Sequence, residues 1–411
     1  MCDGQLADIA AAVGTPAYVY DAGAVRERYR HLTTALARAG VRAHIHYSVK
    51  ANSNLAVLSL LRSLGAGADI VSAGELARVR AAGFPPGAVV FSGVGKTAAE
   101  LEEALRGGVG LVNIESAAEG QMLGCLAARL GVRARVGIRV NPDVTTATHP
   151  YTQTGEKGMK FGVPLDEALA VARQVHGTPS LELRSVGMHI GSQIASAGPY
   201  AAGAGKLAEL VADVRAAGVD TLESVDVGGG LGIAYTAAEE ALDPSAFALA
   251  VAPLQRATGL TLLVEPGRYL VGNAGILLTR VLYRKVSGRR TIAVVDAGMG
   301  DLLRPSLYGA EHPIRVVQGD PDAPPETVDV VGPICETGDF LALDRPLPRV
   351  EPGTLLAVDG AGAYGFVMSS QYNSRPRPAE VLVDGDRWGV VRDRESPADL
   401  MRGERVEPAW R

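Results

Sequence analysis

Short apolar runs of strand length alternate with longer segments of helical periodicity along the first two thirds of the chain. Eight runs are predicted as strands, at residues 44–49, 68–71, 88–91, 110–114, 134–140, 184–190, 224–227 and 261–264. Eight strands alternating with helices over roughly 250 residues fit a closed parallel (β/α)8 barrel of the TIM type better than an open doubly wound sheet. Periodicity alone does not prove closure, so the open sheet remains the alternative.

Three of the intervening helices are predicted to begin with a capping box directly after a strand. The pairs are Ser72 with Glu75, Thr97 with Glu100, and Ser116 with Glu119. In each pair the hydroxyl is expected to accept from the third helical amide while the glutamate reaches back to the amide of the capping residue.

The pattern changes after residue 272. Predicted strands at 275–286, 290–296, 326–331, 354–359, 380–383 and 388–391 follow one another across Pro, Gly and Asp turns. This predicts a mostly antiparallel β domain over residues 271–411. A lone strand at 16–20 has no place in an eight-strand count, so residues 1–21 are expected to join the β domain. A helix at 22–38 then opens the barrel domain, which is predicted over residues 22–270.

Composition narrows the class of protein. With 411 residues, 47% hydrophobic content and a net charge of −5, the chain is long enough for two packed domains and has no basic run suited to nucleic acid. Its three cysteines are scattered without a CxxC pair, which argues against disulfides or a zinc site. The acidic start and the lack of a membrane-length apolar run predict a soluble cytoplasmic protein.

Polar or glycine-rich groups follow nearly every predicted barrel strand. They are Lys50, Asp69 with Ser72, Ser92, Glu115, Arg139 with Asn141, His189 with Ser192, Gly228-Gly229-Gly230 and Glu265-Pro266-Gly267-Arg268. Each has a structural explanation when taken singly, as a cap or a turn residue. Because the active site of such a barrel lies at the carboxyl ends of its strands, together they predict a ring of functional groups at one pole.

Lys50 stands where an apolar strand ends and a helical pattern begins. Burial lowers the pKa of a lysine, and a neutral amine can attack a carbonyl to form a Schiff base. The ordinary alternative is a strand-end lysine that extends into solvent. The other polar strand ends favour the catalytic interpretation.

The run Gly228-Gly229-Gly230-Leu231-Gly232 presents bare backbone amides suited to a phosphate. It is not a dinucleotide fingerprint, because the third required glycine falls on Ile233. The run at 93–97 is not a Walker A loop, because its leading glycine position is Val90. A glycine loop after the seventh strand is the usual place for a phosphorylated ligand.

A lysine, a phosphate loop and an acid after the eighth strand, Glu265, are what pyridoxal 5′-phosphate requires. The lysine forms the imine, the glycine amides hold the phosphate, and the carboxylate keeps the pyridine nitrogen protonated. His189, on an apolar strand, is a candidate to lie flat on the ring; alternatively it is a core histidine.

These motifs resemble those of the fold-type III pyridoxal-phosphate decarboxylases of the alanine-racemase-like barrel class, and among them the diaminopimelate decarboxylases. The resemblance covers nearly the whole chain. It rests on Tyr47-Ser48-Val49-Lys50-Ala51-Asn52, Asn141-Pro142-Asp143, His189-Ile190-Gly191-Ser192-Gln193, Gly228-Gly229-Gly230-Leu231-Gly232, Glu265-Pro266-Gly267-Arg268, Asp296-Ala297-Gly298-Met299, Leu303-Arg304-Pro305, Cys335-Glu336-Thr337-Gly338-Asp339 and Tyr372-Asn373-Ser374-Arg375-Pro376-Arg377.

The resemblance implies a role for each matching position. Lys50 would carry the cofactor, Glu265 would pair with the pyridine nitrogen, and His189 would stack on the ring. Further cofactor contacts would come from Asp69, Arg139, Ser192, Gly229, Gly230, Pro266, Gly267, Arg268 and Tyr364, and substrate contacts from Arg268, Arg304, Tyr308, Glu336 and Tyr364.

Cys335 matches the position of the family's proton donor, although a lone cysteine is ordinarily a small buried hydrophobe. In the family this loop comes from the neighbouring subunit. The resemblance therefore implies a homodimer with active sites shared across the interface.

The leading expectation is decarboxylation of meso-2,6-diaminopimelate to L-lysine. Gly158 and Met159 replace a Glu and an Asn usual in the loop 154–162, Gly300 replaces an Asn, and Thr337 replaces a Ser. These departures keep open a related amino-acid substrate of a siderophore or antibiotic pathway. A non-catalytic pyridoxal-phosphate-binding regulatory protein and a racemase on the same barrel are weaker alternatives.

Overall fold

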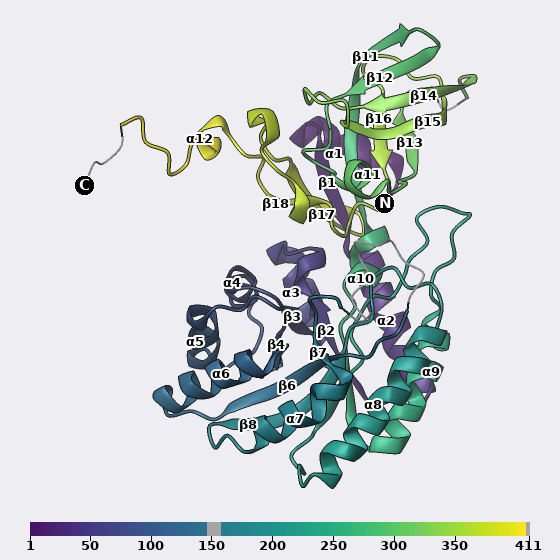
Figure 1. The fold of residues 1–411 in the computed structure, drawn as a ribbon. Helices are drawn as coiled ribbons and strands as arrows, with labels where there is room; N and C mark the ends of the chain where they lie inside the picture. The colour runs from purple at the N-terminus through teal and green to yellow at the C-terminus, as the bar shows by residue number, and fades with distance from the viewer. Residues whose placement is uncertain (146–157, 321, 408–411) are drawn as a thin grey trace. The chain divides into compact units, whose positions relative to one another are not determined.

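The structure is a computed structural model that describes residues 1–145, 158–320 and 322–407 (Figure 1). The chain forms two compact units. One consists of Met1–Ala24 together with Gly272–Arg411, and the other of Val25–Val271. The barrel unit is therefore continuous in sequence, whereas the other unit is built from both ends of the chain.

The unit Val25–Val271 contains a closed barrel of eight parallel strands, as predicted. The strands are β2 (Ala43–Ser48), β3 (Gly67–Ile70), β4 (Val89–Phe91), β5 (Leu111–Ile114), β6 (Ala134–Asn141), β8 (Leu181–Met188), β9 (Ser224–Asp226) and β10 (Thr261–Val264). Pairing of β5 with β6 and of β10 with β2 closes the ring, which excludes the open sheet. The two-residue strand β7 (Val163–Pro164) pairs with the end of β6 outside the ring.

Helices follow the strands and surround the barrel in Figure 1. They are α2 (Ala22–Arg38), α3 (Leu55–Ser63), α4 (Ala73–Ala81), α5 (Ala98–Arg106), α6 (Ala117–Leu130), α7 (Leu165–His176), α8 (Gly198–Ala216), α9 (Pro244–Thr258) and α10 (Arg268–Val271). Between α8 and α9 the buried rings of Tyr200 and Phe247 meet edge to face, with centroids 4.9 Å apart. An aromatic pair of this geometry adds about 1 kcal/mol to the effect of burial alone.

The predicted capping box is complete at one of the three helices. At α5, the Thr97 hydroxyl accepts from the Glu100 amide and the Glu100 carboxylate accepts from the Thr97 amide. In α4 and α6 the serine caps as expected, but the glutamate accepts from one residue further back: Glu75 from the Val71 amide and Glu119 from the Glu115 amide, each at 2.8 Å. These two glutamates therefore tie the helix start to the end of the preceding strand.

The other unit is a mixed sheet of nine strands. They are β1 (Ala17–Asp21), β11 (Gly275–Ser287), β12 (Arg290–Val295), β13 (Ile314–Gln318), β14 (Pro325–Val331), β15 (Phe340–Pro348), β16 (Leu355–Val358), β17 (Ala379–Asp384) and β18 (Arg387–Arg392). The pairings β1–β17 and β12–β14 are parallel and the others antiparallel, so the sheet is mostly antiparallel as predicted. Strand β1 lies between β11 and β17, as expected for the strand that the barrel does not use.

Several elements of this unit are absent from the prediction. They are the strands β13 and β15 and the short helices α1 (Asp3–Val13), α11 (Arg304–Tyr308) and α12 (Pro397–Leu400). Helix α1 buries Leu6 and Ile9 against a sheet core that includes Val19 and Leu278. Strand β15 contains two prolines, which are rare within strands, so its sequence does not show a strand pattern. Asp344 on the same strand lies in the left-handed region.

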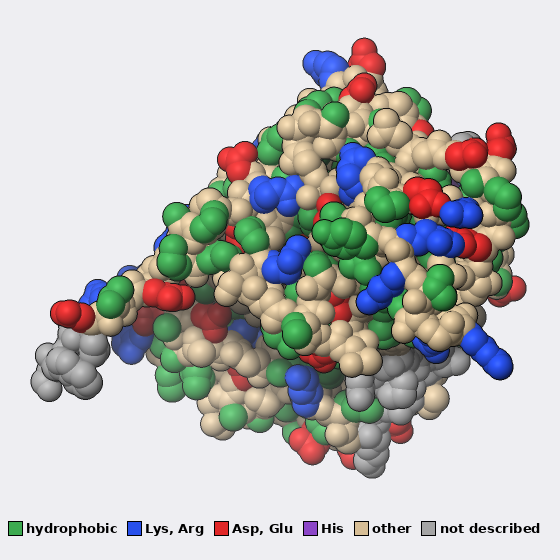
Figure 2. Space-filling view, turned by 90° about the horizontal axis from the view of Figure 1, so that it is seen from above, with side chains coloured by type: hydrophobic (Ala, Val, Ile, Leu, Met, Phe, Trp, Pro, Cys, Tyr) green, Lys and Arg blue, Asp and Glu red, His purple; other side chains and the backbone are tan. Residues whose placement is uncertain are grey.

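Charged side chains of both signs are interspersed with hydrophobic ones on the face shown in Figure 2. This distribution is consistent with the small net charge of −5. Across the described parts of the chain, the helices are too short or too polar to cross a membrane.

Asp301, in the turn after β12, supplies a pH-dependent test of this unit. Burial raises the pKa of its carboxyl to about 7, although the carboxylate accepts from the Gly298 amide at 2.9 Å. A carboxyl with a raised pKa holds its proton in the folded state, so its contribution to the free energy of unfolding falls as the pH rises from about 4 to about 7.

We therefore expect Asp301→Asn to stabilise the protein by about 2 kcal/mol more at pH 8 than at pH 5. The amide oxygen of asparagine can still accept from Gly298 while the cost of ionisation is removed. Urea unfolding followed at both pH values measures the difference. An equal effect at both pH values would contradict the assignment.

Candidate active site

Five of the predicted strand ends meet in one cavity of about 370 Å³ within the barrel unit. Lys50 follows β2, Ser92 follows β4, Arg139 lies on β6, His189 follows β8 and Glu265 follows β10, and all five line this cavity. The remaining lining residues are Val71, Gly93, Val94, Gly95, Asn113, Phe161, Gly187, Met188 and Asp226. The carboxyl ends of the strands thus form a single polar chamber.

Lys50 lies in a 3-10 helix, Val49–Ala51, that begins directly after β2. Its Nζ is 3.3 Å from Oδ2 of Asp69, whose side chain is fully buried, whereas the lysine side chain remains 36% exposed. The Ser48 hydroxyl also lies 3.0 Å from Asp69 Oδ2. The deep burial assumed for the lysine is therefore not found; its amine projects into the cavity beside a buried carboxylate.

Glu265 and Asp226 form a buried pair of acids on the cavity wall. The pKa of Glu265 is raised well above its usual value by burial and by the neighbouring Asp226 and Asp69 carboxyls. Burial also raises the pKa of Asp226 to about 6. Asp226 was not among the predicted site residues. An acid within the apolar run 224–227 was the available signal, of the same kind as Asp69 in the run 68–71.

His189 is held as a neutral imidazole. Its Nδ1 accepts a hydrogen bond from the Gly229 amide at 3.2 Å, which places the ring proton on Nε2. Burial, and then the positive charges of Arg139 and Lys50, lower the pKa of His189 well below its usual value. A flat, uncharged ring at this position suits stacking against another aromatic ring.

Arg139 is fixed by Glu115, which follows β5. Nη1 of Arg139 lies 3.1 Å from Glu115 Oε1, and both side chains are largely buried. Glu115 also accepts from the Gly93 amide at 3.1 Å and from the Gly162 amide at 2.9 Å. The guanidinium carbon is 4.9 Å from the centroid of the Phe161 ring. The carboxylate thus positions both the guanidinium and two loops that border the cavity.

The glycine loop after β9 passes very close to neighbouring backbone. A Cβ at Gly229 would lie 1.9 Å from the Glu265 carbonyl oxygen. At Gly230, where φ is +86°, it would lie 2.1 Å from the Gly191 carbonyl oxygen. Only glycine fits at these positions.

Ser192 and Arg268 meet at the edge of this loop. Arg268 donates from Nη2 to the Ser192 hydroxyl at 3.1 Å and from Nη1 to the Tyr235 hydroxyl. Arg268 begins the short helix α10, directly after Pro266 and Gly267. A Cβ at Gly267 would lie 3.0 Å from the Cβ of Ala51, so this turn packs against the segment that carries Lys50. Tyr235 was not predicted, because no strand end or motif marks it.

We expect Gly229→Ala to lower the free energy of unfolding by about 2–3 kcal/mol, because the added methyl group overlaps the Glu265 carbonyl. Gly205→Ala is the matched control, since a Cβ at Gly205 on α8 meets nothing within 4 Å. That change should stabilise the helix by about 0.5–1 kcal/mol. Thermal unfolding of both variants tests the contrast, and similar effects would contradict it.

Five of the predicted site residues belong to the unit Met1–Ala24 with Gly272–Arg411. They are Arg304, Tyr308, Cys335, Glu336 and Tyr364. Arg304 is buried and donates from Nε to His312 Nε2 at 3.2 Å, and its guanidinium carbon lies 5.9 Å from the Tyr308 ring centroid. Tyr364 has a φ of +55°, in the left-handed region that few residues other than glycine adopt.

Cys335 lies in an exposed loop that neighbouring groups hold in place. Its amide donates to Asn373 Oδ1 at 2.8 Å, and Glu336 accepts from the Tyr372 hydroxyl at 2.8 Å. Asp339 accepts from the Ile334 amide at 2.6 Å and anchors the start of the loop. The thiol is therefore accessible rather than buried in the core, which removes the ordinary structural explanation for it.

The loop 154–162, in which the sequence departs from the diaminopimelate decarboxylase pattern, lies only partly within the residues that the structure describes. Residues 154–157 are outside the described residues. Gly158 and Met159 line a second cavity of about 590 Å³ together with Asn141 and Lys206. Phe161 lines both this cavity and the one that contains Lys50. The departure at 158–159 is thus two residues from a side chain of the candidate site.

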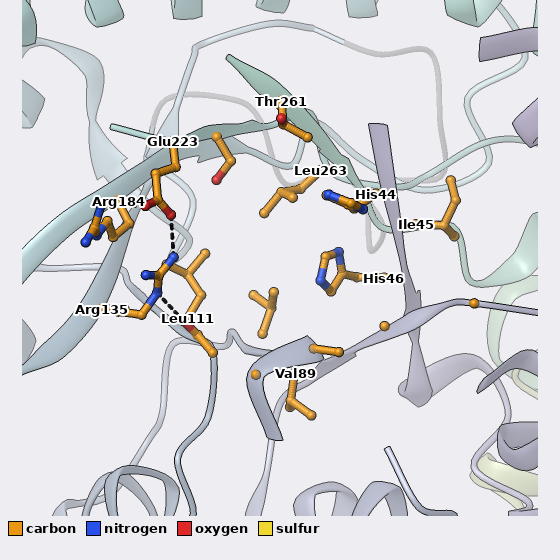
Figure 3. A pocket seen from close by; sticks show the side chains of 17 residues that line it. His44, Ile45, His46, Val89, Leu111, Arg135, Arg184, Glu223, Thr261 and Leu263 are labelled. Atoms are coloured by element: carbon orange, nitrogen blue, oxygen red, sulfur yellow. Dashed lines mark hydrogen bonds and ion pairs between the residues drawn. The ribbon is translucent and has the colours of Figure 1, made fainter. Parts of the chain in front are cut away.

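A further cavity of about 410 Å³ lies at the amino ends of the barrel strands. Figure 3 shows two imidazoles, His44 and His46, directed into it from one side, opposite Arg135 and Arg184. Both arginines form ion pairs with Glu223, so these charges compensate one another. It contains none of the predicted site residues, and the candidate chemistry belongs to the opposite pole.

Sequence comparison identifies a family. Residues 22–272 match the model described as pyridoxal-dependent decarboxylase, pyridoxal binding domain. The diaminopimelate decarboxylase of Pseudomonas aeruginosa is 48% identical over 403 residues, which cover 98% of this chain and 96% of that protein. The diaminopimelate decarboxylase of Vibrio cholerae is 46% identical over 408 residues, covering 98% and 95%.

Solved structures give the same result. The chain resembles the diaminopimelate decarboxylase of Helicobacter pylori complexed with L-lysine at a TM-score of 0.92 and 41% identity, covering 97% of this chain and 98% of that one. A lysine/ornithine decarboxylase from Vibrio vulnificus complexed with putrescine has a TM-score of 0.80 at 19% identity, covering 94% and 98%, and shares the fold alone.

Proposed function

The chain belongs to the diaminopimelate decarboxylase family of pyridoxal-dependent decarboxylases, and we propose that it converts meso-2,6-diaminopimelate to L-lysine and CO2. The observation that carries the proposal is the single cavity in which Lys50, Arg139, His189 and Glu265 meet, in a chain 48% identical to a named relative over 98% of its length.

The cavity residues fit pyridoxal 5′-phosphate. Oε1 of Glu265 is buried and has no hydrogen-bond partner among the described residues, which suits a ring N–H. The amine of Lys50 extends into the cavity, and His189 offers a neutral ring. In our proposal the cofactor is held by Lys50, Asp69, Arg139, His189, Ser192, Gly229, Gly230, Glu265, Pro266, Gly267, Arg268 and Tyr364.

When bound, the cofactor supplies an electron sink for the pair left on the α-carbon as CO2 departs. Glu265 lies in the buried wall of the site, where its Oε1 would accept from the ring N–H. Asp69 lies 3.3 Å from the Lys50 amine and keeps it oriented, and the Glu115 carboxylate fixes Arg139 behind the site. The protein thus contributes orientation and electrostatic stabilisation.

Substrate recognition is proposed for Arg268, Arg304, Tyr308, Glu336 and Tyr364. Guanidinium groups bind carboxylates through two parallel hydrogen bonds and so fix their orientation. Arg268 and Arg304 would bind the substrate carboxylates, while Tyr308 and Glu336 select for the length of the amino acid. Cys335 would donate a proton from its thiol to the α-carbon after CO2 has left.

We also propose a homodimer in which the Cys335 loop of each chain completes the partner's site. The exposed position of that loop and its resemblance to the family's shared loop support this arrangement. Mixing an inactive Lys50→Ala chain with an inactive Cys335→Ala chain should restore part of the activity, because some mixed dimers contain one intact site. The cytoplasmic location stays a prediction from the sequence.

The test is CO2 release by the cofactor-loaded protein from meso-diaminopimelate, with lysine, ornithine and arginine alongside. We expect release from diaminopimelate alone. If none of the four amino acids releases CO2 while the bound-cofactor absorbance is intact, the substrate is a related amino acid. The replacements at Gly158 and Met159 would then be the first candidates for the changed specificity. Epimerisation of a substrate without CO2 would indicate a racemase instead.

A further inference from the structure

A second acid stands behind Glu265, and the mechanism above does not use it. Asp226 is the last residue of β9, is 4% exposed, and lines the same cavity as Glu265. The carboxyls of Asp226 and Glu265 are in hydrogen-bonding contact. Two carboxylates this close cannot both ionise readily in a buried site, so they share a proton.

The position of Asp226 is defined from two sides. Its Oδ1 accepts from the Gly228 amide at 2.8 Å, which ties it to the start of the glycine loop. On β8, a Cβ at Gly187 would lie 2.5 Å from the Cβ of Asp226, so a glycine there makes room for the aspartate. The side chain is thus fixed between a loop amide and a neighbouring strand.

The charged groups that act on this pair come from several elements. Asp69 on β3 raises the pKa of both acids, Arg139 on β6 lowers that of Asp226, and Lys50 lowers that of Glu265. Burial is the largest influence on each acid. Within this set Asp226 is the carboxyl in direct contact with Glu265.

We propose that Asp226 is a positioning residue for the cofactor: its carboxylate accepts a hydrogen bond from the Glu265 carboxyl and orients that side chain so that Oε1 faces the ring nitrogen. This role rests on the proposed function, in which Glu265 faces that nitrogen. A pair of acids that holds one proton carries a single negative charge, and the hydrogen bond between the two carboxyls fixes the direction in which the other oxygen of Glu265 points.

The competing explanation is that the only role of Asp226 is to accept a hydrogen bond from the Gly228 amide. Asp226→Asn separates the two roles, because an asparagine oxygen can still accept from Gly228 while the charge is lost. Asp329→Asn is the matched control in the other unit: this aspartate is 3% exposed and its Oδ1 likewise accepts a backbone amide, that of Asp344, at 2.8 Å. Circular dichroism establishes that the variants fold.

The first readout is the infrared band of protonated carboxyls, measured in cofactor-free protein over a range of pH. At each pH the wild-type spectrum is subtracted from that of the variant. Bands from other carboxyls, such as Asp301, cancel in the difference. In Asp226→Asn we expect the Glu265 band to disappear at a pH lower by about one unit or more, as loss of a neighbouring charge requires. Asp329→Asn should leave it in place. An unshifted Glu265 band in Asp226→Asn overturns the proposal.

The second readout uses the loaded enzyme. We expect Asp226→Asn to lower kcat about tenfold, with KM for the substrate nearly unchanged, and to shift the pH dependence of the bound-cofactor absorbance. If Asp226→Asn does not fold, Glu265→Gln decides: the Asp226 band must titrate at a different pH, and an unchanged band overturns the pairing. Absence of CO2 release by wild type would count against the proposed function and leave the infrared result valid.

Discussion

Lys50→Ala is expected to abolish covalent attachment of the cofactor and to lower CO2 release by at least about a thousandfold. The Lys50 amine is the one that the structure places in the cavity beside Asp69, His189 and Glu265. Alanine removes the attacking nitrogen without adding bulk. Absorbance of the bound cofactor, and mass spectrometry after borohydride reduction, measure the attachment.

Lys285→Ala serves as the matched control, since this lysine lies on β11 and has no predicted role in the site. It should retain both the absorbance and the turnover of wild type. A covalent cofactor that survives reduction in Lys50→Ala would show that another lysine carries it, and the central assignment would fail.

Cys335→Ala is expected to keep the cofactor and to lose about 10²–10³-fold in kcat, the range typical of a removed general acid. The thiol is exposed in a loop anchored by Asp339 and Asn373, so its loss should not disturb packing. A solvent isotope effect on turnover should change as well, because proton delivery becomes slower.

Cys125→Ala is the control for Cys335→Ala, since Cys125 is also an exposed thiol but lies on α6. It should behave as wild type in both assays. A near-normal kcat for Cys335→Ala would show that this thiol is not the proton donor.

The barrel was predictable because its strands are mostly buried, so that short, largely apolar runs recur between helical segments. Every residue of β3, β4 and β5 is buried. The smaller unit was harder. Strand β13 is mostly half-exposed, and β15 carries prolines, so neither shows a clean strand pattern. The first helix was missed because its buried face consists of only Leu6, Ile9 and Ala10.

The candidate site was predictable where it follows the topology of the barrel. In a closed parallel barrel the carboxyl ends of the strands lie at one pole, so residues that follow them lie close together. Lys50, His189 and Glu265 were predicted in this way, and all three line one cavity. Asp226 was missed although it lies on its strand, as Asp69 and Arg139 do on theirs. It is the final residue of β9, and the glycine motif directly after it was the stronger signal. The exposure of Lys50 also differed from expectation, because its 3-10 helix carries the amine beyond the buried end of β2.

The place of β1 has a consequence for how the protein is made. Ala17 pairs with Leu278 on one side and with Ala379 on the other. A ribosome therefore releases the whole barrel sequence before either partner of this first strand exists. Since domains fold as units during synthesis, the barrel can assemble while β1 waits with both edges unpaired, a state open to faulty pairing with other chains. The residues of β1, which are translated before the barrel, thus reach their final partners only after the barrel has been translated.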